Sequence, residues 1–172
     1  MHSQKLEMTI EELMQKGILE NQNEQKWMVI DKKVNGKVIA NWKGDGASGR
    51  GVLTAQSGAF KNMPYTFKTR FENDNGELGT NPEELIAGAL AGCFNMKLSF
   101  VLNESNFNPD ELNTEALLTF EDGKILSVDL NLDAKVTGIS KEKFNELAKE
   151  AKDNCPISGA LNCQINLNAT LV

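Results

Sequence analysis

One well-capped apolar helix is the sequence feature that most constrains the fold of this chain. Asn81 suits the N-cap, Pro82 the first helical position and Glu84 the third, so a helix is predicted to begin there and to run to about Asn103. Its early part, LIAGALAGCF, is so apolar and so rich in Ala and Gly that we expect it to be buried, with other backbone packed closely against it. We therefore predict a fold built around this helix.

Strand-like segments lie on both sides of the helix in the sequence. Residues 27–43 contain two such runs around the turn signal Asn35–Gly36 and predict a hairpin. In residues 65–71, aromatic residues and Thr alternate with polar and charged residues, which predicts a strand. Residues 114–138 predict a second hairpin around Asp122–Gly123, because apolar residues alternate strictly in its second arm.

Two further helices and a last strand complete the expected order. A capping box at Thr9 predicts a short helix over 9–19, and residues 140–154 carry apolar residues on one helical face. The C-terminal QINLNATLV alternates like a strand. We predict an α+β protein in which antiparallel sheets pack around the central helix. Residues 1–36 form an N-terminal extension, and 37–172 form the main domain.

Composition excludes several classes of function. The 172 residues carry 18 Lys and Arg against 24 Asp and Glu, a net charge of −6 without a basic run, so no nucleic-acid partner is expected. The sole histidine is His2, which argues against Ser/His and Cys/His hydrolases and against a His-rich metal site. The N-terminus lacks an apolar signal segment, and the most apolar run, 85–94, is too short to span a membrane. We expect a cytoplasmic protein without a membrane partner.

The segment GDGASG at 44–49 has the spacing of a dinucleotide fingerprint. That motif requires a helix directly after it to bind a pyrophosphate, and here a strand is expected to follow. We interpret the segment as a turn between strands and expect no bound cofactor and no metal.

The three cysteines form neither a disulfide framework nor a zinc-ribbon spacing. By position alone, we interpret Cys93 as a small buried residue of the apolar helix and Cys163 as a structural residue. Cys155 precedes Pro156, which places its thiol at a predicted helix start, where a thiolate is favoured. The 61 residues between Cys93 and Cys155 leave open whether the two thiols meet.

Arg70 and Glu83 also have ordinary explanations. Arg70 shares a predicted strand face with Lys68 and Glu72, and that face could be solvated. Glu83 complements the positive end of the helix that follows it. Either residue gains a chemical role only if it approaches a thiol.

Three segments together resemble a known family. PYTFKTRFE, GTNPEELIAGALAGCFNMKLSF and NCPIS are similar to the OsmC/Ohr family of organic hydroperoxide reductases, with TRFE and TNPEELI as in its OsmC branch. The resemblance extends from about Val38 to the C-terminus. The chain departs from many OsmC proteins in having Leu90 where they have a histidine, and in its longer N-terminus.

The resemblance implies a mechanism and a partner. Members are α+β proteins that form intertwined homodimers with two active sites at the interface, and they reduce organic hydroperoxides to alcohols. By this resemblance, Cys93 is the peroxidatic cysteine and Cys155 the resolving one; Arg70 and Glu83 are the activating pair, with Arg50 as second-choice arginine. A Cys93–Cys155 disulfide would form, and a dithiol of the dihydrolipoyl type on a lipoylated carrier protein would reduce it.

Helix geometry adds an expectation about where the site lies. Glu83 and Cys93 are ten residues apart on one predicted helix, hence ~15 Å along its axis and about 280° around it. They cannot share a site unless the helix breaks or the carboxylate serves the partner's thiol. We favour composite sites in a homodimer whose central helices pack through their small residues, Ala87, Gly88, Ala89, Ala91 and Gly92.

Two other hypotheses remain open at this point. The chain could be a non-enzymatic member of the family that binds a small apolar ligand at the dimer interface, for which separated thiols would be evidence. Residues 1–25 could form a docking or dimer-extending arm.

Overall fold

The computed structural model describes residues 33–72 and 79–172. The chain divides into two units, Met1–Gly36 and Lys37–Val172, and the described helices and strands belong to the second unit. The helix predicted over 9–19 and residues 27–32 of the hairpin predicted over 27–43 lie outside the described residues, and residues 33–37 form no strand.

The first sheet is antiparallel and contains β1 (Val38–Lys43), β2 (Arg50–Ala55) and β3 (Met63–Thr66) in that order. The second arm of the predicted hairpin is thus β1, which pairs with β2 across the Gly-rich segment 44–49. A strand follows that segment, as predicted. Trp42 and Tyr65 pack together with ring centroids 5.3 Å apart. Both rings lie over Gly51, where a Cβ atom would collide with them.

The strand predicted over residues 65–71 is wrong from Phe67 onward. The chain leaves β3 after Thr66 and forms a short helix, α3 (Phe67–Phe71). Thr66 and Thr69 cap its first turn reciprocally: the Thr66 hydroxyl accepts from the Thr69 N–H at 3.0 Å, and the Thr69 hydroxyl accepts from the Thr66 N–H at 2.8 Å. Phe67 and Phe71 then lie one turn apart, with ring centroids at 4.7 Å.

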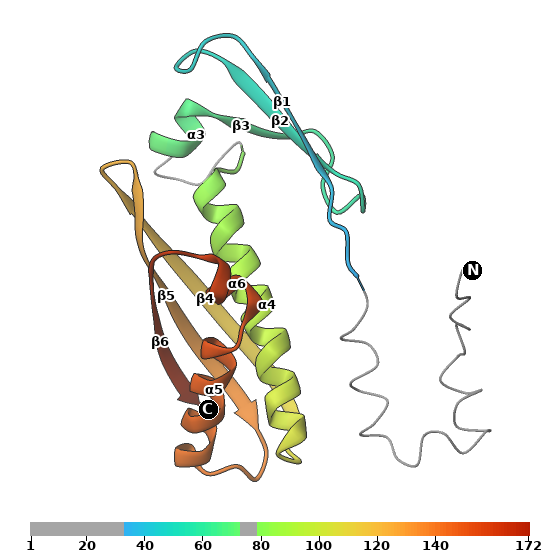
Figure 1. The fold of residues 1–172 in the computed structure, drawn as a ribbon, viewed down its shortest axis with the longest axis vertical. Helices are drawn as coiled ribbons and strands as arrows, with labels where there is room; N and C mark the ends of the chain where they lie inside the picture. Colours follow the sequence, from blue (N-terminus) through green and yellow to red (C-terminus); the bar gives the residue numbers. More distant parts are fainter. Residues whose placement is uncertain (1–32, 73–78) are drawn as a thin grey trace, which may run out of the picture. The chain divides into compact units, whose positions relative to one another are not determined.

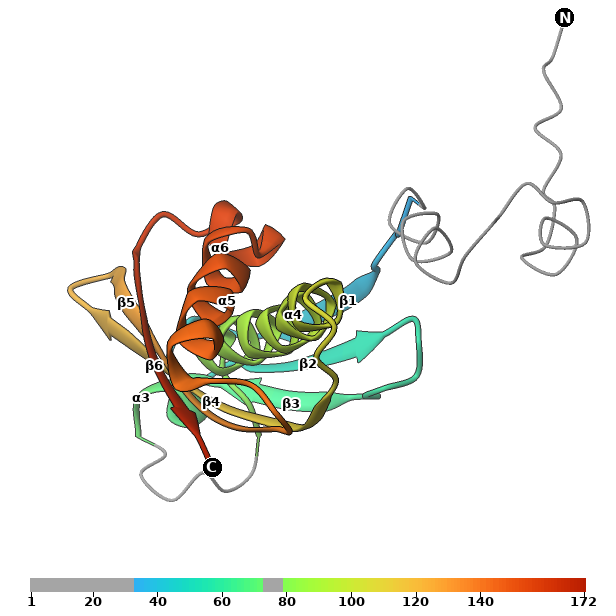
Figure 2. The same ribbon diagram turned by 90° about the horizontal axis from the view of Figure 1, so that it is seen from below.

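The hydrophobic core lies between the second sheet and three helices. The sheet contains β4 (Pro109–Glu121), β5 (Lys124–Val136) and β6 (Gln164–Leu171). The helices are α4 (Pro82–Glu104), α5 (Lys141–Asp153) and α6 (Pro156–Ala160). Figures 1 and 2 show α4 running along one face of this sheet with α5 beside it. The core residues of β5 are Val128, Leu130, Leu132, Ala134 and Val136.

The predicted hairpin and the two C-terminal elements are confirmed. β4 and β5 are antiparallel and joined at Asp122 and Gly123, both with positive φ, as a two-residue hairpin turn requires. The apolar face of α5 is buried as expected. β6, however, runs parallel to β5, whereas an antiparallel sheet was expected. A parallel neighbour requires a crossover connection, and α5 and α6 supply it.

The predicted N-terminus of α4 is confirmed, because the Asn81 side chain accepts a hydrogen bond from the Glu84 N–H at 2.8 Å. The expected burial of its early part holds for one face only. Leu90, Phe94 and Leu98 are fully buried, whereas a second stripe is exposed in the chain, namely Leu85, Gly88, Ala89, Gly92 and Met96. We call these five residues the exposed stripe of α4.

The apolar run 85–94 lies inside α4, which ends at Glu104, close to the predicted end near Asn103. By length and composition alone, the 23-residue α4 could cross a membrane. The core helix of a soluble domain passes the same test, and one face of α4 belongs to the hydrophobic core. The apolar composition of α4 therefore has two sources: one face is buried in the core, and the other carries the exposed stripe.

Candidate functional site

The fold brings Cys93 and Cys155 together. Cys93 lies in the middle of α4 and is partly buried, while Cys155 is the N-cap of α6 and is 2% exposed. Their Sγ atoms are 3.0 Å apart although the residues are 62 positions apart in the chain. Pro156 opens α6, so the predicted placement of Cys155 at a helix start is confirmed. Two thiols at this distance can form a disulfide with little movement of the backbone.

Burial and hydrogen bonding act differently on the two thiols. Burial raises the pKa of Cys93, and the hydrogen bond with Cys155 raises it further. Burial also raises the pKa of Cys155, but the neighbouring Cys93 thiol and the donor groups of Ser158 and Ile157 outweigh this and leave the pKa lowered. When the pair holds one proton, this arrangement therefore favours the negative charge on Cys155.

Arg70 and Glu83 form a second pair, at the N-terminal end of α4. Arg70 Nε donates to Glu83 Oε2 at 3.0 Å and Nη2 donates to Oε1 at 2.5 Å, so the guanidinium grips both carboxylate oxygens. Its Cζ atom also lies 4.7 Å from the ring centroid of Phe120 and 4.9 Å from that of Phe71. Contacts with α3, α4 and β4 together fix the direction of this side chain.

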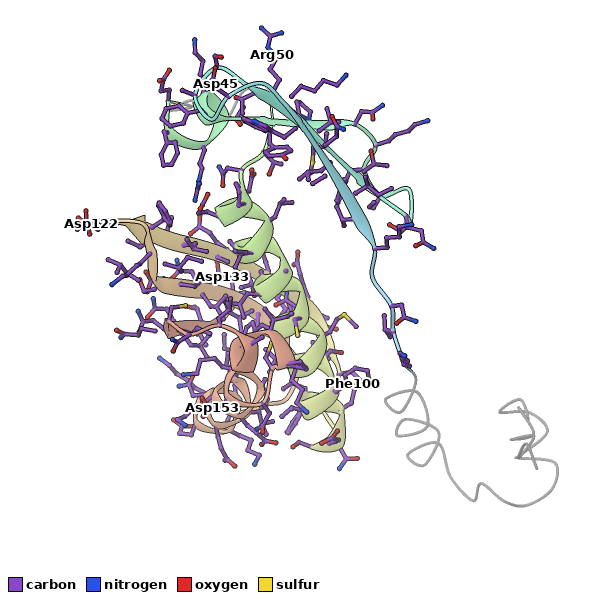
Figure 3. The ribbon with its side chains drawn as sticks, turned by 45° about the horizontal axis from the view of Figure 1, so that its top comes forward. Asp45, Arg50, Phe100, Asp122, Asp133 and Asp153 are labelled. Carbon is purple, nitrogen blue, oxygen red and sulfur yellow. The ribbon has the colours of Figure 1, made fainter. Side chains whose placement is uncertain are left out.

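Arg50 lies elsewhere. It opens β2 opposite Thr66 of β3 and Lys43 of β1, and in Figure 3 its side chain projects outward from that sheet. No ion pair involves Arg50 within residues 33–72 and 79–172. Of the two arginines considered from the sequence, the structure joins Arg70 to Glu83.

The structure therefore brings the predicted site residues together as two pairs rather than as one cluster. Because α4 continues without a break from Pro82 to Glu104, Glu83 and Cys93 are ~15 Å apart along its axis. A cavity of about 610 Å³ lies beside Arg70 and Glu83. Ala87, Gly88, Ala91 and Phe120 contribute to its wall, and neither cysteine lines it.

Three residues at these pairs were not expected from the sequence. Phe71 and Phe120 contact Arg70, and Ser158 lies one turn after Cys155. Phe71 belongs to the TRFE motif, but nothing in the pattern around Phe120 indicated its partner. Cys163 packs against the core and forms no part of either pair.

The described part of the chain offers no metal site: no three side chains of His, Cys, Asp or Glu are grouped to hold an ion. The chemistry available at the two pairs is that of thiols, a guanidinium and a carboxylate.

The chain is similar to proteins of one family. The family model described as "OsmC-like protein" matches residues 73–170. "Peroxiredoxin OsmC" of Escherichia coli K12 is 38% identical over 142 residues, which cover 80% of this chain and 97% of that protein.

Solved structures agree with the expected fold. The crystal structure of the organic hydroperoxide resistance protein OhrB of Bacillus subtilis is 27% identical, with a TM-score of 0.57 over 81% of this chain and 98% of that one. The OsmC-like protein from Mycoplasma pneumoniae, 16% identical, shares the fold with a TM-score of 0.63 over 83% of this chain and 99% of its own. With its long central helix, its two sheets and these similarities in sequence and structure, the chain belongs to the OsmC/Ohr family.

Proposed function

We propose that this protein is a thiol-dependent peroxidase that reduces organic hydroperoxides to alcohols through Cys93 and Cys155. The observation that carries the proposal is the 3.0 Å separation of the two sulfur atoms. The relatives named as a peroxiredoxin and as organic hydroperoxide resistance proteins support the same class of activity. A non-enzymatic ligand-binding role would leave the two thiols without reason to meet.

The reaction proceeds in three steps. In the form of the pair in which Cys155 keeps the proton, the Cys93 thiolate attacks an oxygen of ROOH, the S–O bond forms and the O–O bond breaks, and RO⁻ leaves and takes a proton to give the alcohol. Cys155 then loses its proton and attacks the Cys93 sulfenic acid; a disulfide forms, and the displaced hydroxide takes up a proton and leaves as water. An external dithiol, of the dihydrolipoyl type carried by a lipoylated protein in our proposal, restores both thiols by exchange.

The arginine acts mainly on the leaving oxygen. A thiol of pKa ~8.5 is only about 3% ionised at pH 7, and lowering its pKa to ~5.5 raises the thiolate fraction about 30-fold. The same shift lowers nucleophilicity about 20-fold for a Brønsted slope of ~0.45, so the two effects nearly cancel. A guanidinium aimed at the developing RO⁻ supplies a larger effect. We assign this role to Arg70, which Glu83 and the two phenylalanine rings hold in place.

The complete site requires two chains in this proposal. Arg70 and Glu83 lie about three helical turns from Cys93 of the same α4. The exposed stripe of α4 has room for a close neighbour, since a Cβ added at Gly88 or Gly92 meets no atom within 4 Å in the chain. In a homodimer packed along this stripe, the partner's Arg70 reaches Cys93. Apolar walls around it suit alkyl or fatty-acyl hydroperoxides, and we place the dimer in the cytoplasm.

Turnover and thiol counting test the chemistry. The prereduced protein is given cumene hydroperoxide and dihydrolipoamide, and free thiols are counted after one equivalent of peroxide. We expect rapid turnover, loss of two thiols per chain, no turnover in Cys93→Ser, and normal turnover in the matched control Cys163→Ser. An intact wild-type protein that neither consumes peroxide nor loses thiols would contradict the proposal.

Mixed dimers test the composite site. Cys93→Ser and Arg70→Met are each expected to be inactive, but co-refolding equal amounts would create heterodimers with one intact site. Random pairing then restores about a quarter of the wild-type activity. The matched control mixes Cys93→Ser with Cys155→Ser and restores none, because both sulfur atoms come from one chain. Failure of the first mixture, with heterodimers present, would place the whole site in one chain.

A further inference from the structure

A buried hydroxyl next to Cys155 has no hydrogen-bond partner. Ser158 Oγ is the one such side-chain oxygen or nitrogen atom among the residues that the structure describes. A buried hydroxyl left unpaired costs about 1–3 kcal/mol, and one explanation for keeping it is that another state of the site supplies the partner.

The position of Ser158 identifies that partner. Cys155 is the N-cap of α6 and Ser158 is its third residue, the relation that Thr66 and Thr69 have in α3. In α3 the two side chains cap the turn reciprocally. In α6 the Cys155 side chain forms no such capping bond. A neutral thiol is a weak acceptor, whereas a thiolate accepts strongly from O–H and N–H groups.

The charged side chains near Cys155 are engaged elsewhere, so Ser158 is left as the side-chain donor to a Cys155 thiolate. On α4, the ionisable group facing the Cys155 sulfur is the Cys93 thiol. At the end of α5, Lys152 donates to the Ile165 carbonyl and pairs with Asp153, which also pairs with Lys149. The Ser158 hydroxyl and the N–H groups at the start of α6 lower the pKa of Cys155 against the effect of burial.

We propose that Ser158 is a positioning residue whose hydroxyl donates to the Cys155 thiolate and so makes Cys155 the sulfur released when the oxidised pair is reduced. This step rests on the proposed peroxidase function. The thiolate of an external dithiol attacks Cys93 Sγ, a mixed disulfide forms there, the Cys93–Cys155 bond breaks, and its electron pair stays on Cys155. Exposure favours the same direction, because Cys155 is 2% exposed whereas Cys93 is only partly buried.

Titration of a single thiol tests the role of Ser158 independently of peroxide chemistry. In the full chain carrying Cys93→Ser and Cys163→Ser, thiolate absorbance near 240 nm follows Cys155 alone. Adding Ser158→Ala is expected to raise the Cys155 pKa by about one unit, a tenfold decrease in its dissociation constant. Ser158→Thr should restore the lower value, as Thr69 occupies the equivalent position in α3.

A melting curve separates this role from a structural one. Ser158→Ala removes an unpartnered hydroxyl, so the melting temperature of the reduced protein should stay the same or rise. A Cys155 pKa that is unchanged in Ser158→Ala, with the protein folded, overturns the proposal even if peroxide is consumed normally.

The reduction step is measured in the otherwise wild-type chain. After one equivalent of peroxide, Ser158→Ala should be reduced by dihydrolipoamide about threefold more slowly, for a Brønsted slope of ~0.45 and one pKa unit. Acid-quenched mixtures with a monothiol should carry the adduct on Cys93. An adduct on Cys155 would overturn the assigned direction. A wild-type chain that forms no disulfide contradicts the peroxidase instead, and the titration still decides the role of Ser158.

Discussion

Replacing Arg70 by lysine should separate catalysis from stability. Lysine keeps the positive charge but loses the fork that holds both Glu83 oxygens and the flat face that lies near Phe71 and Phe120. An oriented donor at a developing oxyanion contributes about 10²- to 10³-fold to the rate, so Arg70→Lys should lower kcat/KM by that order. The side chains of Arg70 and Glu83 are 33% and 16% exposed, so water screens their attraction. We therefore expect a stability loss of only about 1 kcal/mol or less.

The assay compares Arg70→Lys with the matched control Arg50→Lys. Initial rates of cumene hydroperoxide reduction with dihydrolipoamide give kcat/KM, and thermal melts of the reduced proteins give stability. Arg50→Lys should stay close to the wild type in both, because Arg50 lies on β2 away from Glu83. An Arg70→Lys protein within about threefold of wild-type kcat/KM would refute our role for Arg70, and so would a larger loss in Arg50→Lys.

Three further predictions concern the dimer, a helix cap and acid stability. Gly92→Leu should leave the fold of the chain intact, because a Cβ there meets open space, but should weaken the homodimer; a dimer of unchanged affinity in sedimentation would contradict close packing of the exposed stripe of α4. Thr66→Ala removes the cap of α3 and should cost about 0.5–2 kcal/mol in urea unfolding, and a smaller change would show that packing alone holds α3. Hydrogen bonds from the Ser48 side chain and from the Ser48 and Ala47 N–H groups lower the pKa of Asp45 from 3.8 to about 2. Its carboxylate therefore stabilises the fold above pH 3.8, and this contribution is lost as the pH falls towards 2; Asp45→Asn should flatten the pH dependence of unfolding in that window, and an equally steep curve would contradict the assignment.

Elements set by local interactions could be predicted from the sequence. Asn81 starts α4 because its own side chain caps the helix, and Asp122–Gly123 turns the β4–β5 hairpin because that turn requires positive φ. Each signal lies within four residues of the structure that it specifies, so no distant contact is needed to interpret it.

Predictions failed where distant contacts decide the structure, or where the spacing of apolar residues fits both a strand and a helix. Phe67 and Phe71 are spaced equally well for a strand face and for one helical turn, and the Thr66–Thr69 cap selects the helix. The parallel pairing of β6 depends on the crossover through α5 and α6, which residue alternation does not encode. The small residues of α4 predicted burial but could not show that one stripe stays exposed in the chain.

The candidate site divides in the same way. The place of Cys155 at a helix start followed from Pro156, whereas its contact with Cys93 was implied by family resemblance and not by their spacing. Ser158 lies at the third position of the helix that Cys155 caps, and the ring of Phe120 lies against Arg70. Neither relation can be recognised before the side chains are placed in the fold.

The crossover that carries Cys155 gives the proposed disulfide a second effect, on the unfolded chain. A bond between residues 62 positions apart would close a long loop, and chain entropy alone then favours the folded oxidised protein by about 4 kcal/mol. Oxidation by peroxide should accordingly raise the melting temperature, and a reductant should lower it. Thermal stability would then report the redox state of the pair, and equal melting temperatures for the two states would argue against a bond across this loop. The reduced protein would be the less stable form, and each cycle of oxidation and reduction would form and break the covalent link between α4 and the crossover.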